Sequence, residues 1–161
     1  MINEELYRQA KALGACKEGL AAIPYSSERE LVEAYKRYID FSIDKCFPGE
    51  DFIQERFSAD VLHGCGVYVR ERVSLGDCRG VTVLNSCSGE VAVTGFSVAT
   101  VYVRGKSDVS VRCGGMCKVH VYAYDDSCVR VRREGSAHVF CISHGNSILE
   151  SDGEVTVRKK P

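Results

Sequence analysis

The chain has 161 residues, of which 45% are hydrophobic and 27% charged, and its formal net charge at pH 7 is −1. This composition is that of a globular protein and excludes a disordered chain. The near-neutral charge gives no overall field that would select nucleic acid or an anionic membrane. No run of 18 apolar residues occurs, and the N-terminus is acidic where a signal peptide would be basic. We therefore expect a cytoplasmic protein with no membrane span.

Charge and hydrophobic pattern both change along the chain. Residues 1–61 hold 8 Lys/Arg against 12 Asp/Glu, a net charge of −4, and residues 62–161 hold 13 against 10, a net charge of +3. Apolar residues recur at helical spacing in the first part and at every second position in the second. The sequence therefore predicts a helical cap segment over 1–61 and a repeat region over 62–161 that together form one cooperative unit.

The first part begins with two short helical segments. Asn3 is placed to cap a first helix, and Gly14 is placed to end it. A second short segment covers residues 17–23 and leads to Pro24.

The clearest helix start is Ser27, which with Glu30 forms a capping-box pattern. This helix is expected to run to about Lys45, and a last short helix to cover residues 50–57. The aromatic and aliphatic residues on these helices are expected to form a core, because apolar helical faces usually bury against a neighbour.

In the second part, short alternating runs predict β-strands with one buried face. The runs are Val67–Val69, Val81–Val83, Val91–Val93, Val101–Val103, Val109–Val111, Val119–Val121, Val129–Val131, Val139–Cys141 and Val155–Val157. From Val109 to Val139 the step is ten residues each time.

The turns between these strands repeat as well. Residues that tolerate a left-handed backbone, Gly105, Gly115, Asp125 and Gly135, stand four positions before the valines. Small residues, Ser107, Cys117, Ser127 and Ala137, stand two positions before them.

This repeat predicts a single-domain β-solenoid of two short strands per coil and roughly five coils, within an α+β chain. Right-handed coils are expected, because parallel crossovers strongly prefer that hand. The alternative is an antiparallel β-sandwich with a helical cap, in which strands also recur every 8–12 residues. We favour the solenoid because the same turn residue recurs at the same offset.

Stacking at a period of twenty residues predicts the outward faces of the solenoid. One face would present Tyr102 with Arg104, His120 with Tyr122, and Phe140 with Ile142, preceded by Tyr68 and Leu84. This face is too apolar to be left in water, so we expect the helical segment or a second copy to cover it.

The opposite face would present Ala92 and Thr94, then Ser110 with Arg112, and Arg130 with Arg132. Stacked arginines fit a regular series of anions, so this face supports nucleic-acid or polyanion binding as an alternative function. Nearby acidic residues favour a solvated face of mixed charge instead.

The nine cysteines, at positions 16, 46, 65, 78, 87, 113, 117, 128 and 141, include no C-x-x-C pair. An odd number without an export signal argues against disulfides, so reduced thiols that serve as small core residues are expected. Two groupings resemble metal ligands: Cys113 and Cys117 with His120, and His138, Cys141 and His144. They lie inside a strand pattern and not on tight turns, so we expect no metal and no cofactor.

No sequence motif for an enzyme is present. Cysteine nucleophiles can be built from Cys141 with His138 or His144, or from Cys65 with His63, but neither pair has a third group to orient it. We therefore predict a protein that is not an enzyme and has no catalytic residue.

Four segments carry a resemblance to known proteins: Leu6-Tyr-Arg-Gln-Ala through Cys16, Tyr35-x-x-Tyr-Ile-Asp-Phe-Ser-Ile, Pro48-x-x-Asp-Phe-Ile and Val81-Thr-Val-Leu-Asn. Together they resemble small proteins of gut Bacteroidetes and their phages or prophages. The function of that family is unassigned, so the resemblance implies a phage-related binding or assembly role and no site residue. The strand repeat is more loosely similar to bactofilin-like solenoids, which polymerise end to end, although the helical N-terminus departs from that pattern.

The sequence thus predicts a non-catalytic binding or assembly module whose partner is a protein or a second copy, so a homo-oligomer is expected. The candidate binding residues are Tyr102, Tyr122, His120 and Phe140 on one face and Arg112, Arg130 and Arg132 on the other.

Overall fold

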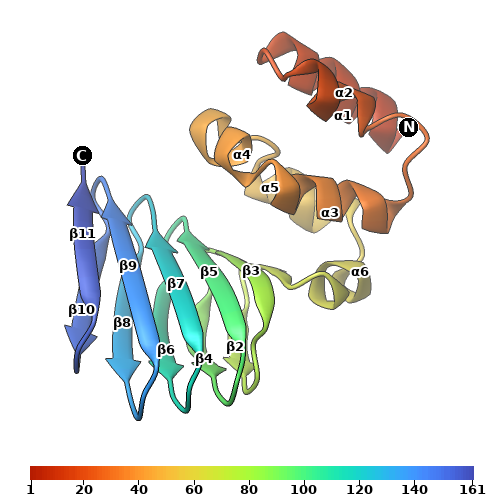
Figure 1. The fold of residues 1–161 in the computed structure, drawn as a ribbon. Coiled ribbons are helices and arrows are strands. Elements are labelled where there is room, and N and C mark those ends of the chain that lie inside the picture. Colours follow the sequence, from red (N-terminus) through yellow and green to blue (C-terminus); the bar gives the residue numbers. More distant parts are fainter. The chain divides into compact units, whose positions relative to one another are not determined.

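The computed structural model describes all 161 residues and divides the chain into two compact units, Met1–Cys65 and Gly66–Pro161. The first unit is helical and the second is made of strands and turns. Figure 1 shows both units, coloured along the chain.

Six helices form the first unit: α1 (Ile2–Ala12), α2 (Lys17–Ala21), α3 (Glu28–Arg37), α4 (Ile39–Lys45), α5 (Glu50–Arg56) and α6 (Ala59–Gly64). The predicted capping box is present, because the Ser27 hydroxyl accepts from the Glu30 amide at 3.2 Å and the Ser27 amide donates to the Glu30 carboxylate at 2.6 Å. The predicted stop at Gly14 is also present, with φ at +83°.

Two predictions for the helices are wrong. Asn3 does not cap α1, because its side-chain amide donates to the carbonyls of Ile23 and Ser26 at 2.9 Å each, tying the start of α1 to the segment after α2. The long helix expected up to Lys45 is divided at Tyr38, whose φ of −104° and ψ of 35° leave the helical region. Helix α6, capped by its preceding serine, was not expected.

Eleven strands form the second unit: β1 (Val67–Val69), β2 (Arg72–Leu75), β3 (Gly80–Asn85), β4 (Ser88–Val93), β5 (Val98–Arg104), β6 (Asp108–Cys113), β7 (Lys118–Ala123), β8 (Cys128–Arg133), β9 (His138–His144), β10 (Ile148–Asp152) and β11 (Thr156–Lys160). Strands β2 and β10 were not anticipated, because neither carries the paired valines of the other runs.

These strands form a β-solenoid of about five coils. The odd-numbered strands build a six-stranded sheet in the order β1-β3-β5-β7-β9-β11, and the even-numbered ones a five-stranded sheet in the order β10-β8-β6-β4-β2. Every pairing is parallel. In Figure 1 the strands of each sheet follow one another in sequence colour from green to blue. The predicted solenoid is confirmed, and the antiparallel sandwich is excluded.

The repeated turn residues have the expected backbone. Gly105, Gly115, Asp125 and Gly135 have φ of +66°, +69°, +58° and +62°. The small residues that follow them are buried inside the corner, with Cys117 and Ser127 at 0% and 1% exposure. The solenoid interior is a stack of valines, each of which stabilises the fold by about 1.5–3 kcal/mol on burial.

The predicted inward and outward faces are exchanged in β1 and β3. Leu84, expected outside, pairs with Val103 and lies in the core, and Tyr68 pairs with Leu84 and packs against that core. Val83, expected inside, is the register partner of the outward Tyr102. This offset is 19 residues where later pairs are 20 apart, and an odd offset moves every side chain to the opposite face.

Candidate binding surfaces

The outer face of the six-stranded sheet brings the predicted aromatic residues together. Tyr102 is the register partner of Tyr122, which is the partner of Ile142, and His120 is the partner of Phe140. Since these offsets are all 20 residues, the side chains project from one face in two adjacent columns. We call Tyr102, His120, Tyr122, Phe140 and Ile142 the aromatic face.

The rings of this face are stacked along the solenoid axis. Those of Tyr102 and Tyr122 lie 5.1 Å apart at 18°, and those of Tyr124 and His144, in the next column, lie 4.4 Å apart at 11°. In a stack, each ring covers the plane of its neighbour, so ring edges and not ring planes face outward. The aromatic face therefore offers few free ring planes against which bases or sugars could stack. Tyr124 and His144 were not among the residues predicted for this face, although they share the 20-residue offset.

The aromatic face lies in a sheet without acidic residues. None of its six strands contains Asp or Glu. The cations of these strands are Arg104, Lys118, Arg158, Lys159 and Lys160. The Arg158 guanidinium lies over the Phe140 ring, 5.5 Å from its centroid, whereas Arg104, which was expected on the open face, is only 7% exposed. The strands of this sheet are therefore cationic, while the exposed carboxylates of Asp125 and Asp126 lie in the turn that follows β7.

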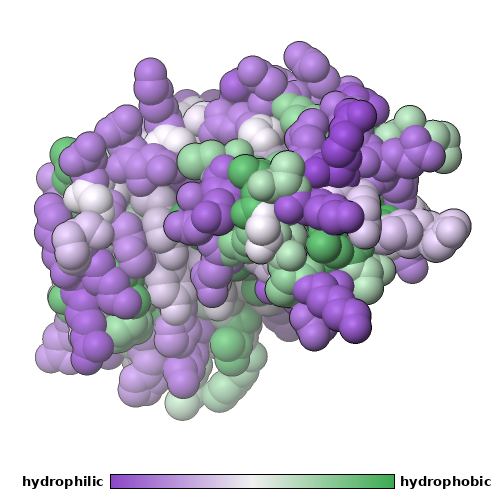
Figure 2. All heavy atoms as spheres, turned by 90° about the horizontal axis from the view of Figure 1, so that it is seen from above, coloured by the Kyte–Doolittle hydropathy of each residue, from purple (hydrophilic) through white to green (hydrophobic).

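An exposed apolar patch continues this face at the solenoid corner. Phe96, Val98 and Met116 are 84%, 64% and 60% exposed, and we call them the corner patch. Phe96 and Met116 each follow a turn glycine, and Val98 is the register partner of Lys118 on β7. In Figure 2 hydrophobic residues appear as patches among a mostly hydrophilic surface. Several large apolar side chains exposed near one corner are a candidate interaction site.

The outer face of the five-stranded sheet carries the three predicted arginines. They line a groove of about 560 Å³. Arg112 and Arg132 are register partners, and Arg132 is in turn the partner of Asp152, just as Arg130 is the partner of Glu150. The structure therefore places the arginines together but stacks two of them next to carboxylates.

Two of these three arginines form ion pairs. Arg130 contacts Asp108 at 3.0 Å, and Arg132 contacts Glu134 at 3.3 Å, whereas Arg112 forms no ion pair. All these side chains are substantially exposed, so each pair contributes little to stability. Because three carboxylates, of Glu90, Glu150 and Asp152, share the groove with the three guanidiniums, the groove has no net positive charge.

The cysteines considered as nucleophiles do not share a strand face with a histidine. Cys141 is fully buried, and burial raises the pKa of its thiol to about 12. His138 and His144 alternate with it on β9 and project from the opposite side of the strand. Cys65 and His63 lie at the end of α6 and not on a strand, so the expected shared face between them does not exist.

The two groupings that resembled metal ligands are also separated. Cys113 and Cys117 point into the core, whereas His120 lies on the aromatic face. Nowhere in the 161 residues do three His, Cys, Asp or Glu side chains come together in a way that suits a metal ion.

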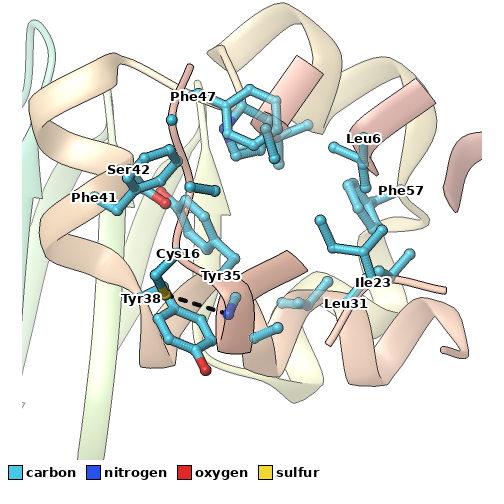
Figure 3. Close-up of a pocket in the computed structure, with 18 of the residues that line it drawn as sticks. Leu6, Cys16, Ile23, Leu31, Tyr35, Tyr38, Phe41, Ser42, Phe47 and Phe57 are labelled. Atoms are coloured by element: carbon cyan, nitrogen blue, oxygen red, sulfur yellow. Dashed lines mark hydrogen bonds between the residues drawn. The ribbon is translucent and has the colours of Figure 1, made fainter. Parts of the chain in front are cut away.

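The helical unit contains an apolar cavity of about 340 Å³. Figure 3 shows Leu6, Leu31 and Phe57 on one side of it and Phe41 and Phe47 on the other. These residues were predicted to form a packed core, and their helical spacing does not indicate that they surround a space.

No helix is long and apolar enough to cross a membrane. Comparison of the chain with known proteins finds no matching family, no matching curated protein and no matching solved structure.

Proposed function

We propose that this protein is a non-catalytic binding and assembly module that self-associates through the aromatic face and the corner patch. The observation that supports this function is the combination of exposed apolar side chains with cationic side chains on strands that contain no acidic residue. A regular β-solenoid provides a rigid surface on which such residues keep a fixed spacing. The resemblance noted in the sequence extends the proposal to a phage-related assembly role.

Charge complementarity favours a second copy of the chain as the partner that covers the aromatic face. Two copies of the cationic aromatic face repel each other, so a face-to-face dimer is not favoured. The same chain carries a complementary surface, because residues 1–61 have a net charge of −4. We propose that the helical unit of one copy docks on the aromatic face of another, with the corner patch buried at the contact.

Absolute mass in solution tests this proposal. Light scattering on a sizing column at about 50 mM salt is expected to show an oligomer, and at about 500 mM salt a shift toward monomer, because salt screens the charge attraction. Replacing the exposed Phe96 and Met116 by aspartate should give monomer at both salt concentrations, because carboxylates in the contact would be desolvated. Their exposure means that the fold should tolerate the change.

Ile148→Asp is the matched control, since Ile148 is 57% exposed but lies on β10 of the other sheet. Its mass is expected to equal that of the unchanged protein. A strict monomer at every salt and protein concentration would contradict self-association, as would an oligomer that withstands the Phe96 and Met116 substitutions.

Polyanion binding by the arginine groove is the alternative function, and its one supporting observation is that Arg112 forms no ion pair. We expect the groove not to act in this way, because its guanidiniums are matched by carboxylates. Elution of the protein from heparin should therefore be the same for Arg112→Ser and for the unchanged chain. Earlier elution of R112S, with no change for K118S on the other sheet, would instead establish polyanion binding at the groove.

A further inference from the structure

We infer that the helical unit binds a small, uncharged, apolar molecule in its cavity, a site separate from the aromatic face. Protein interiors are packed as densely as organic crystals and contain few voids larger than a water molecule. The space of about 340 Å³ between these helices is much larger than such a void, and because exposed residues form part of its rim it is a pocket and not a sealed interior void. It falls in the size range of ligand pockets, roughly 300–1,000 Å³.

The lining of the cavity defines the chemistry of the ligand. None of the residues that line it is Asp, Glu, Lys, Arg or His. A charged ligand would lose its hydration there without gaining a partner, so the cavity selects against ions. Its polar side chains are two tyrosines, Tyr35 and Tyr38, together with Ser42 and Cys16. The ligand is thus a largely hydrocarbon molecule with at most one or two hydrogen-bonding groups.

Volume sets the size of the ligand. An apolar protein cavity of about 150 Å³ is large enough to hold benzene, so this one holds a molecule of roughly two aromatic rings or an aliphatic chain of similar bulk. Phe41 and Phe47 meet edge to face in its wall, with centroids 6.3 Å apart at 78°, and suit contact with an aromatic guest.

Access to the cavity lies between α1 and α2. Gly14 and Cys16, which line the cavity, are both exposed, and a side chain built on Gly14 would meet nothing within 4 Å. By contrast, Leu6, Leu31 and Ile53 in its floor are at most 5% exposed. The site has a dry floor and an open rim, as a reversible binding pocket requires.

N-phenyl-1-naphthylamine, an uncharged probe of two linked aromatic groups, tests the inference on the full chain. We expect saturable binding of a single probe per chain, with enhanced fluorescence. Ala10→Phe places a ring in the cavity and should weaken probe affinity by at least about tenfold, because guest and side chain compete for one space. Ala34→Phe, on α3, should also weaken probe affinity by at least about tenfold. It provides a second test of the cavity if Ala10→Phe misfolds.

Ala12→Phe is the matched control, because Ala12 lies on the same helix, is exposed and does not line the cavity. It should leave probe affinity unchanged. A filled cavity should also raise or preserve the thermal midpoint of A10F or A34F. Absence of saturable binding, or equal affinity in A10F, A34F and A12F, would overturn the inference.

Discussion

Gly89→Ala is expected to destabilise the solenoid by more than about 3 kcal/mol, because overpacking and backbone strain combine at this position. Gly89 has a φ of +124°, and a Cβ atom there would lie 2.0 Å from the carbonyl oxygen of Val73. That oxygen belongs to the backbone of β2, which pairs directly with Gly89 on β4, so it cannot move without breaking the sheet. Chemical denaturation followed by circular dichroism would measure the loss.

Gly145→Ala is the control that separates the steric clash at Gly89 from the cost of placing an alanine at positive φ. Gly145 also has positive φ, +59°, but a Cβ there would meet nothing within 4 Å. Its replacement should cost about 1 kcal/mol, the usual penalty for a left-handed alanine. Equal destabilisation by G89A and G145A would show that the close approach of β2 and β4 does not exist in solution.

The solenoid could be predicted because its constraint is local and repeated. A corner needs a left-handed residue such as Gly115 or Gly135, the next turn residue must be small, and the strand interior accepts β-branched side chains. Because every turn and strand repeats this pattern of residue types, the period of ten residues can be recognised without any knowledge of tertiary contacts. The stacking of Tyr102 on Tyr122 follows from that period alone.

The register of β1 and β3 could not be predicted in the same way. The offset of 19 residues between Val83 and Tyr102 arises in the turn between β3 and β4, which has two residues, Ser86 and Cys87, where the turn between β5 and β6 has three. The left-handed residue of this turn is Ser86 and not a glycine, so no residue type marks the shorter turn. The exchange of Val83 and Leu84 between faces follows from this single residue.

The helical unit was predicted less completely, because its features depend on how helices pack. The capping box at Ser27 is a local sequence signal, and it was predicted correctly. The division of the helix at Tyr38 was not predicted, because no proline or glycine stands at that position. The cavity arises from the distances between helices, and sequence spacing does not fix these. Apolar residues at helical positions look the same whether they fill a core or line a pocket.

Thiol labelling should divide the cysteines sharply. At pH 8 we expect the exposed Cys16 and Cys46 to react with iodoacetamide, and the buried Cys113 and Cys141 to stay unmodified in the folded protein. Burial raises the pKa of Cys113 and of Cys141 to about 12 from an ordinary value of 9.0. Since the thiolate is the nucleophile, its fraction at pH 8 falls about 1,000-fold, before any steric exclusion is counted. Timed labelling with peptide mass spectrometry would measure each site.

The same pKa shifts make the stability of the solenoid depend on pH. The two thiols hold their protons more tightly in the folded than in the unfolded state, so their contribution is complete below about pH 9 and is lost as pH rises through about 12. The denaturation midpoint should therefore decrease above pH 9, and decrease less in a Cys113→Ala, Cys141→Ala double variant.

For the thiol-labelling experiment, labelling in denaturant provides the control, because all nine thiols should then react. Rapid modification of Cys141 in the folded chain would instead reveal an open core and would restore this cysteine as a candidate nucleophile.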